Sequence, residues 1–259
     1  MQGKIIRDLL ILLGVFGLIW LIFSLFTYPD DPHVLSVGKE EKLGESYLNL
    51  ILLNPMFGEF ENEKVDSMVA IISDRLAGGL GNSEYNYRFV VFENEMINAF
   101  TVPGGNILIS TGLIAFCDTP EELASVMAHE MGHVEKRHVV TRLIKELGLE
   151  ILTSGDAFVL GEVTGLLTSS SFDRKQEEEA DLFAVRLLEN SSIEPRTLAT
   201  FFRKLEDETD NELMQHFEII STHPNFRSRI REALSYTPEK EFEAEVIELN
   251  WEAMKEELK

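Results

Sequence analysis

The stretch Ala128-His129-Glu130-Met131-Gly132-His133 places two histidines four residues apart, with a glutamate directly after the first. In a helix the two imidazoles lie one turn apart on one face, so both can reach a single Zn²⁺. Glu130 lies beside them, where it can take a proton from a zinc-bound water and later give it to a leaving amine. A chance occurrence is the alternative, so the surrounding sequence has to decide.

The residues before this stretch predict the start of a helix. Thr119 suits the N-cap, Pro120 the first helical position, and Glu122 is placed to complete a capping box. Apolar residues then recur beside the histidines at Leu123, Val126, Met127 and Val134. The pattern predicts a long, half-buried helix that runs to about Leu147 and ends at Gly148.

A catalytic zinc needs a third protein ligand, because one of its four positions is kept for water. The segment 173–188 is predicted to be an amphipathic helix with Glu177 and Asp181 on one face. Small residues on that face, Ala180 and Ala184, would let it approach the first helix closely. Glu177 is then a candidate ligand and Asp181 a candidate hydrogen-bond partner of a ligand histidine. A solvated acidic face is the alternative, and we favour it for Glu178 and Glu179.

Together, these motifs resemble metallopeptidase family forty-eight, which includes the CAAX prenyl proteases. The similarity extends over roughly Val34 to Ser235 and rests on four stretches in a fixed order. They are Asn98–Ile107 (Asn-Ala-Phe-Thr-Val-Pro-Gly-Gly-Asn-Ile), Glu122–His133 with His138 beyond it, Glu177–Asp181, and Ser221-Thr222-His223-Pro224 with Arg229.

The resemblance implies a zincin-type (gluzincin) metalloprotease domain in which a glutamate from a second helix completes the zinc site. His129, His133 and Glu177 would bind one Zn²⁺ per chain, and Glu130 would be the catalytic acid and base. It also places a substrate-binding strand at Asn98, Ala99 and Phe100, although from the pattern alone a plain core hairpin is at least as good an interpretation.

Two further residues are candidates through the same resemblance. His223 is either a displaceable fourth zinc ligand that holds the enzyme inactive or a group that steadies the tetrahedral oxyanion. Arg229 either stabilises the oxyanion as well or pairs with Asp181. The sequence does not choose between these roles.

The N-terminus predicts a membrane anchor. Leu9 to Tyr28 is a run of 20 uncharged residues, and at about 1.5 Å per residue it is long enough to cross a ~30 Å hydrocarbon core. Basic residues precede the run and acidic residues follow it. This pattern predicts a single pass of the cell (inner) membrane, with residues 1–8 in the cytoplasm and an extracytoplasmic or periplasmic catalytic domain over 29–259. A cleaved signal peptide is the alternative.

The rest of the chain predicts an α+β fold that is mainly helical, with a small sheet. Helices are expected over Val34–Leu53, Glu61–Leu76 and 195–205, and strands over Tyr87–Phe92 and on both sides of a Pro103-Gly104-Gly105 turn. Loops are expected at Gly78–Asn82 and Glu206–Glu212, a helical cover or lid over Glu150–Ser171, and a C-terminal helix over 239–259.

Composition narrows the function. The net charge of −22 argues against nucleic acid as a partner. The single cysteine, Cys117, excludes an internal disulfide and a thiolate zinc cluster, and its apolar surroundings predict that it is buried.

The sequence therefore predicts a membrane-anchored zinc metalloendopeptidase. Its substrates would be peptide segments of membrane or extracytoplasmic proteins, consistent with protein quality control in the envelope. The alternatives are a prenyl-type processing peptidase, disfavoured because one span cannot form a multi-helix membrane chamber, and a membrane-tethered chaperone or scaffold with a structural or latched zinc site.

Overall fold

The computed structural model describes residues 7, 11–19, 35–148, 152, 161–163, 165–167, 171–209, 218–238 and 242–258. The chain divides into two units, Met1–Asp31 and Pro32–Lys259, and the second contains the predicted site. Three predictions lie largely outside the described residues. They are the cytoplasmic segment 1–8, the two ends of the predicted span, and the lid over Glu150–Ser171.

The predicted membrane anchor is corrected by the first unit. Residues 11–19 of the predicted span are helical, which at about 1.5 Å per residue reaches only roughly 14 Å. Among the residues that the structure describes, no helix is long and apolar enough to cross a bilayer. This finding contradicts the predicted single pass of the inner membrane with an extracytoplasmic catalytic domain, and that prediction is wrong.

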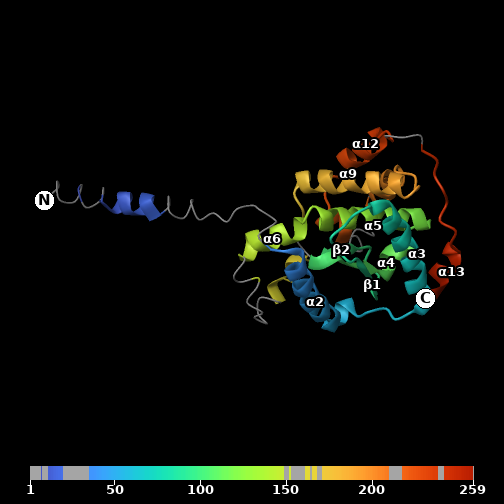
Figure 1. Cartoon of the computed structure of the whole chain (residues 1–259), viewed down its shortest axis with the longest axis horizontal. Helices are drawn as coiled ribbons and strands as arrows, with labels where there is room; N and C mark the ends of the chain where they lie inside the picture. Colours follow the sequence, from blue (N-terminus) through green and yellow to red (C-terminus); the bar gives the residue numbers. More distant parts are fainter. Residues whose placement is uncertain are drawn as a thin grey trace. The chain divides into compact units, whose positions relative to one another are not determined.

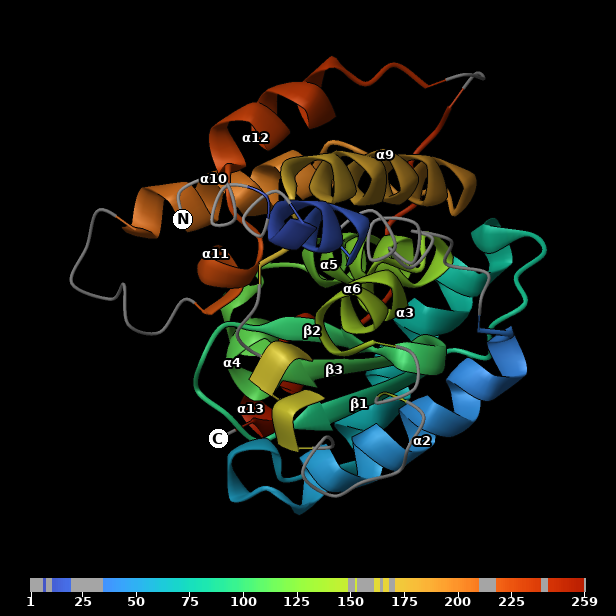
Figure 2. The same cartoon turned by 90° about the vertical axis from the view of Figure 1, so that its left-hand side faces the viewer.

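The second unit is mainly helical with a small sheet, as predicted (Figure 1). Its described helices are α2 (Val37–Leu53), α3 (Glu63–Leu80), α4 (Thr111–Phe116), α5 (Pro120–Glu135), α6 (His138–Leu147), α9 (Arg174–Asn190), α10 (Thr197–Thr209), α11 (Glu218–Thr222), α12 (Phe226–Ser235) and α13 (Trp251–Glu257). Two short 3-10 turns, η2 (Pro55–Phe57) and η3 (Pro103–Gly105), join neighbouring elements. Figure 2 shows α5 above the sheet, α9 beyond α5 and α12 beyond α9.

The sheet has three strands in the order β1-β3-β2, namely β1 (Arg88–Phe92), β3 (Asn106–Ser110) and β2 (Ala99–Val102). Strand β3 is parallel to β1 and antiparallel to β2, so β2 is an edge strand. The predicted turn between β2 and β3 is confirmed. Gly104 has a φ of 79°, and a Cβ there would lie 2.5 Å from the Cα of Glu41 in α2. Only glycine fits this close approach in that conformation.

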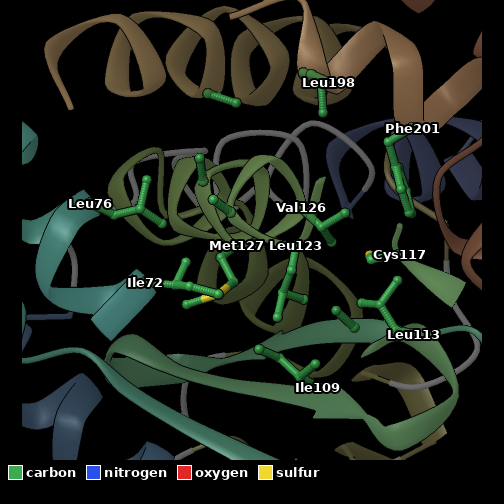
Figure 3. Close-up of a cluster of buried hydrophobic side chains, with 14 of the residues drawn as sticks. Ile72, Leu76, Ile109, Leu113, Cys117, Leu123, Val126, Met127, Leu198 and Phe201 are labelled. Carbon is green, nitrogen blue, oxygen red and sulfur yellow. The ribbon is translucent and has the colours of Figure 1, made fainter. Parts of the chain in front are cut away.

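Both faces of the sheet are buried, against different helices. Alternate residues such as Ala99 and Ile109 join a core with α3 and α5. Their neighbours, such as Phe100 and Leu108, join a second core with α2 and α6. Figure 3 shows Met127 of α5 within the first core. The helix that carries the histidine pair is thereby fixed to the sheet along its apolar stripe.

The predicted helix 119–147 is broken at Arg137, which has a left-handed φ of 56° and separates α5 from α6. The cause is a contact from far away in the chain. The buried guanidinium of Arg137 lies 2.7 Å from the carboxylate of Glu40 in α2 and also donates to the Leu35 carbonyl. The turn brings His138, the first residue of α6, back towards the histidine pair. The predicted end at Gly148 is confirmed.

Three other boundaries differ from the predictions. Helix α3 runs through Gly78 and Gly79 to Leu80, and Gly79 allows the close passage of Ser191. Helix α10 continues to Thr209, into the predicted loop. Of the described residues 242–258 in the predicted C-terminal helix 239–259, only those of α13 are helical. In the segment before α13, some backbone N–H groups donate to acceptors far away in the sequence rather than to the carbonyl four residues earlier. Glu245, for example, donates to the Ser192 carbonyl at 2.8 Å.

Candidate metal centre

Helix α5 positions the histidine pair as the sequence predicts. The Thr119 hydroxyl caps the helix by accepting from the amide of Glu122 at 3.3 Å. The Glu122 carboxylate accepts from the Asp118 amide at 2.8 Å, one residue before the cap, so the expected reciprocal bond is displaced. His129 and His133 lie one turn apart and are almost fully buried, with 4% and 0% of each residue exposed.

Helix α9 brings the acidic candidates to the same place. Asp173 caps it in a capping box with Gln176. Its buried face packs on α5 so closely that a Cβ on Gly132 would lie 2.9 Å from the carbonyl oxygen of Ala180 and 3.3 Å from its Cβ. The predicted close approach thus occurs, and it needs a glycine inside the histidine motif as well as alanines in α9.

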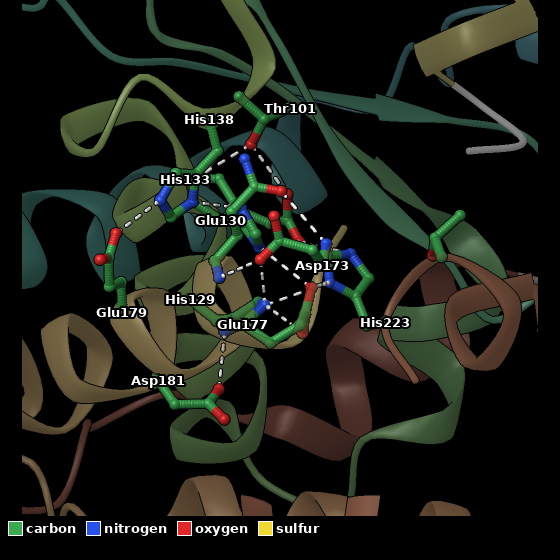
Figure 4. Close-up of polar contacts among 12 residues, drawn as sticks. Thr101, His129, Glu130, His133, His138, Asp173, Glu177, Glu179, Asp181 and His223 are labelled. Carbon is green, nitrogen blue, oxygen red and sulfur yellow. Dashed lines mark hydrogen bonds and ion pairs between the residues drawn. The ribbon is translucent and has the colours of Figure 1, made fainter. Parts of the chain in front are cut away.

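Four side chains converge at the crossing of α5 and α9: His129, His133, Glu177 and His223, with one donor atom of each within 4.8 Å of the others (Figure 4). The Nε2 atoms of His129 and His133 are 3.1 Å apart. His223 Nδ1 lies 3.2 Å from His129 Nε2 and 2.9 Å from Glu177 Oε1. The three predicted ligands are therefore brought together, and His223 with them.

This donor set fits a metal ion. Burial and the neighbouring histidines hold the pKa of His133 well below its usual value, so its ring is neutral and a lone pair is available. Burial raises the pKa of Glu177, but its contacts with His223 and Arg229 outweigh burial and lower that pKa, which favours the ionised carboxylate. Imidazole nitrogens with one carboxylate oxygen are the ligands of a zincin-like site.

Asp181 and Arg229 form a buried ionic layer behind the ligands. Asp181 Oδ1 lies 2.9 Å from Nδ1 of His129. The guanidinium of Arg229 binds both oxygens of Asp181 at 2.7 Å and lies 2.6 Å from Glu177 Oε2. Although burial raises the pKa of Asp181, Arg229 outweighs it and holds that pKa well below its usual value. The predicted pairing of Arg229 with Asp181 is present in the structure.

Glu130 is fully buried beside the cluster and is held through one oxygen. The Thr101 hydroxyl on β2 donates to Glu130 Oε2 at 2.8 Å. The other oxygen, Oε1, lies 3.4 Å from Nε2 of His223 and has no hydrogen-bond partner among the described residues. Sequence reasoning missed Thr101. The available signal was its position: Thr101 is a polar residue in an otherwise apolar strand, directly after the predicted substrate-binding residues Asn98–Phe100.

The predicted substrate strand overlaps β2, and all three of its predicted contact residues are buried. Asn98, Ala99 and Phe100 are 1%, 1% and 3% exposed. The ring of Phe100 packs in the core, 5.6 Å from the ring of Phe57 and 5.9 Å from that of Phe92. A peptide bound along β2 would therefore contact its main chain.

An aromatic ring packs directly against the histidines of the cluster. Phe172, just before α9, stacks on His133 with ring centroids 3.8 Å apart and an interplanar angle of 24°. It also lies 5.5 Å from the ring of His223. With each of the four converging residues at most 4% exposed, the centre is closed in this conformation.

Comparison with known proteins agrees with this geometry. The beta-barrel assembly-enhancing protease of Escherichia coli is 29% identical over 222 residues, covering 77% of this chain and 44% of that protein. The mitochondrial metalloendopeptidase OMA1 of Schizosaccharomyces pombe is 25% identical over 184 residues, covering 68% and 54%. The metalloprotease LoiP of Escherichia coli is 31% identical over 155 residues, covering 56% and 60%. The chain thus spans about half the length of these relatives.

The sequence profile of peptidase family M48 matches residues 61–237, which include all four converging side chains. This match covers more than half of the chain and confirms both the resemblance seen in the motifs and the predicted enzyme class, a metallopeptidase. The chain belongs to peptidase family M48.

Proposed function

We propose that residues 29–259 form a zinc metalloendopeptidase that binds one Zn²⁺ through His129, His133 and Glu177. The observation that carries this proposal is the convergence of buried donors, with the carboxylate of Glu177 3.6 and 3.7 Å from the two histidine Nε2 atoms. Zinc bound there would act as a Lewis acid, lowering the pKa of a coordinated water and stabilising negative charge on a substrate carbonyl oxygen.

Glu130 is the proton carrier in this proposal. Thr101 holds Oε2, which leaves Oε1 directed at the cluster as the atom that accepts a proton from the attacking water. The same oxygen then gives the proton to the leaving amine. A merely structural metal site needs ligands but no such base, so Glu130 favours the peptidase over a scaffold.

His223 is a displaceable fourth ligand in this proposal. Its Nδ1 contacts Glu177 and His129, and its Nε2 faces Glu130. The ring therefore occupies the space beside the proton carrier where a scissile peptide bond has to lie, and it must move away before cleavage. These contacts favour a latch over the oxyanion role. Arg229 is then a positioning residue, since it orients Glu177 and Asp181.

The substrates in this proposal are extended segments of other proteins, as in protein quality control. Two observations support it. β2 is an edge strand whose Thr101 contacts Glu130, so a peptide added to that edge would run past the proton carrier. The first of the relatives above is named as a protease that enhances β-barrel assembly.

The closed site also supports the alternative of a chaperone or scaffold with a permanently latched metal. Casein cleavage by the purified chain separates the two, with wild type, Glu130→Gln and His223→Ala at equal zinc content. We expect His223→Ala to cleave faster than wild type, and Glu130→Gln to keep zinc and lose cleavage. If none of the three zinc-loaded proteins cleaves, or if Glu130→Gln cleaves as wild type does, the endopeptidase proposal fails and the scaffold stands.

A further inference from the structure

Beyond the metal ligands, a surface carboxylate is connected to the centre through a second histidine. We propose that Glu179 sets the tautomer of His133 through His138, and so fixes which nitrogen of His133 faces the metal. The inference rests on the proposed zinc site, but it concerns residues that neither the ligand set nor the chemical step includes.

The three side chains form a row at one end of the site (Figure 4). His138 Nδ1 lies 3.0 Å from Nδ1 of His133, and His138 Nε2 lies 3.1 Å from Oε2 of Glu179. The side chain of His138 is 5% exposed, whereas that of Glu179 is 40% exposed. Two contacts therefore connect the solvent-exposed carboxylate of Glu179 to the ring of His133, a proposed metal ligand.

The order of donors and acceptors in this row follows from the carboxylate. An ionised carboxylate only accepts, so Nε2 of His138 must carry the hydrogen that it donates to Glu179. In neutral His138 the other nitrogen, Nδ1, then has a lone pair and accepts from Nδ1–H of His133. The ring of His133 consequently carries its hydrogen on Nδ1, and its Nε2 presents a lone pair to the cluster, which is the tautomer that a metal ligand needs.

Glu179 differs in this respect from its acidic neighbour. Its Oε1 lies 3.4 Å from Nζ of Lys175 on the surface, while Oε2 turns inwards to His138. Glu178 instead pairs with Arg174, one turn earlier on the same helix, at 2.8 Å. The solvated acidic face expected for both residues therefore describes Glu178, and Glu179 has a second contact that points into the site.

Zinc affinity is the first test, measured by competition with a chelator on the full chain. Glu179→Ala removes the acceptor at the end of the row, and Glu178→Ala is the matched control on the same helix. We expect Glu179→Ala to weaken zinc binding about tenfold or more, the size of effect typical for partners that orient a ligand, and Glu178→Ala to bind as wild type does. Equal affinities of the two variants would overturn the inference.

Substitutions of His138 separate orientation from simple packing. The amide oxygen of His138→Asn can still accept from Nδ1–H of His133, whereas His138→Leu offers no acceptor. We expect the Asn variant to bind zinc more tightly than the Leu variant. The same affinity in both, at equal stability, would show that His138 only fills space.

The tautomer itself is read from ¹⁵N NMR of the imidazole rings in the metal-free chain. We expect the hydrogen on Nδ1 of His133 and on Nε2 of His138 in wild type, and a mixture of tautomers in Glu179→Ala. His133 with its hydrogen on Nε2 in wild type contradicts the inference. Failure of the wild-type chain to bind zinc at all would instead contradict the proposed function, so the two failures are distinguishable.

Discussion

Gly132 of α5 and Ala180 of α9 are in backbone contact: a Cβ on Gly132 would lie 2.9 Å from the carbonyl oxygen of Ala180. This contact sets the distance between the helix that carries His129 and His133 and the helix that carries Glu177. The site therefore depends on a packing detail as much as on its ligands.

Gly132→Ala should push the two helices apart. We expect a loss of about 1–3 kcal/mol in the free energy of unfolding, as is usual for an added methyl in a packed interface, together with weaker zinc binding. Urea denaturation and chelator competition measure the two effects. Gly78→Ala is the control, because Gly78 lies in α3 with open space around a new Cβ, and there alanine should be neutral or stabilising. Equal losses in both variants would contradict this account of the contact.

Thr101→Val should separate the proton carrier from metal binding. The substitution keeps the shape of the side chain but removes the hydroxyl that holds Glu130 Oε2. We expect zinc content to stay at the wild-type level and kcat to fall by about tenfold to a hundredfold, since a misplaced catalytic group loses that much. Thr101→Ser should recover most of kcat. A kcat that is unchanged in Thr101→Val would mean that Glu130 is positioned by other contacts.

Arg229→Met should destabilise the metal-free protein strongly. It leaves the carboxylates of Asp181 and Glu177 buried without their cation, and breaking a buried pair in this way typically costs about 3–5 kcal/mol. Urea unfolding in the presence of a chelator measures it. Arg227→Met is the control, because Arg227 pairs with Glu206 on the surface and its side chain is 88% exposed. Its loss in the free energy of unfolding should stay below about 1 kcal/mol. If Arg229→Met loses no more free energy of unfolding than Arg227→Met, the buried ion pairs of Arg229 do not stabilise the fold.

Cys117 should be unreactive in the folded protein. The thiol is completely buried, and burial raises its pKa well above the usual value. A thiol-specific reagent at mildly alkaline pH should therefore modify it only after unfolding. The pKa of Cys117 is higher in the folded than in the unfolded chain. The contribution of the buried thiol to the free energy of unfolding is therefore complete below the unfolded pKa of about 8.5, and it is lost as pH rises above that value. Rapid modification of the native chain would contradict the buried position.

The local parts of the fold and site could be predicted from the sequence. The capping residue Thr119 and the apolar stripe of α5 act within a few residues of the histidine pair, and the small residues of α9 predict its approach. Glu177 follows from that approach. Each of these signals is a short-range sequence pattern whose structural meaning follows from helix geometry.

What could not be predicted depends on contacts between distant parts of the chain. The break at Arg137 is made by Glu40, 97 residues away. The extended segment before α13 is held by acceptors such as Ser192. The hydrogen bond from Thr101 to Glu130 requires the sheet and α5 to be packed together first. The predicted membrane anchor rests on the apolar run and its flanking charges, which are local signals, and the described helix over residues 11–19 is shorter than that run.

The central claim is that His129, His133 and Glu177 hold the metal that serves cleavage. The most direct test is the zinc content of the purified chain by mass spectrometry, for wild type, His133→Ala and Glu130→Gln, with casein cleavage measured on the same samples. The account predicts one zinc per chain in wild type and Glu130→Gln, little or none in His133→Ala, and no cleavage in either variant. Wild type without zinc, or His133→Ala with as much zinc as wild type, would contradict it.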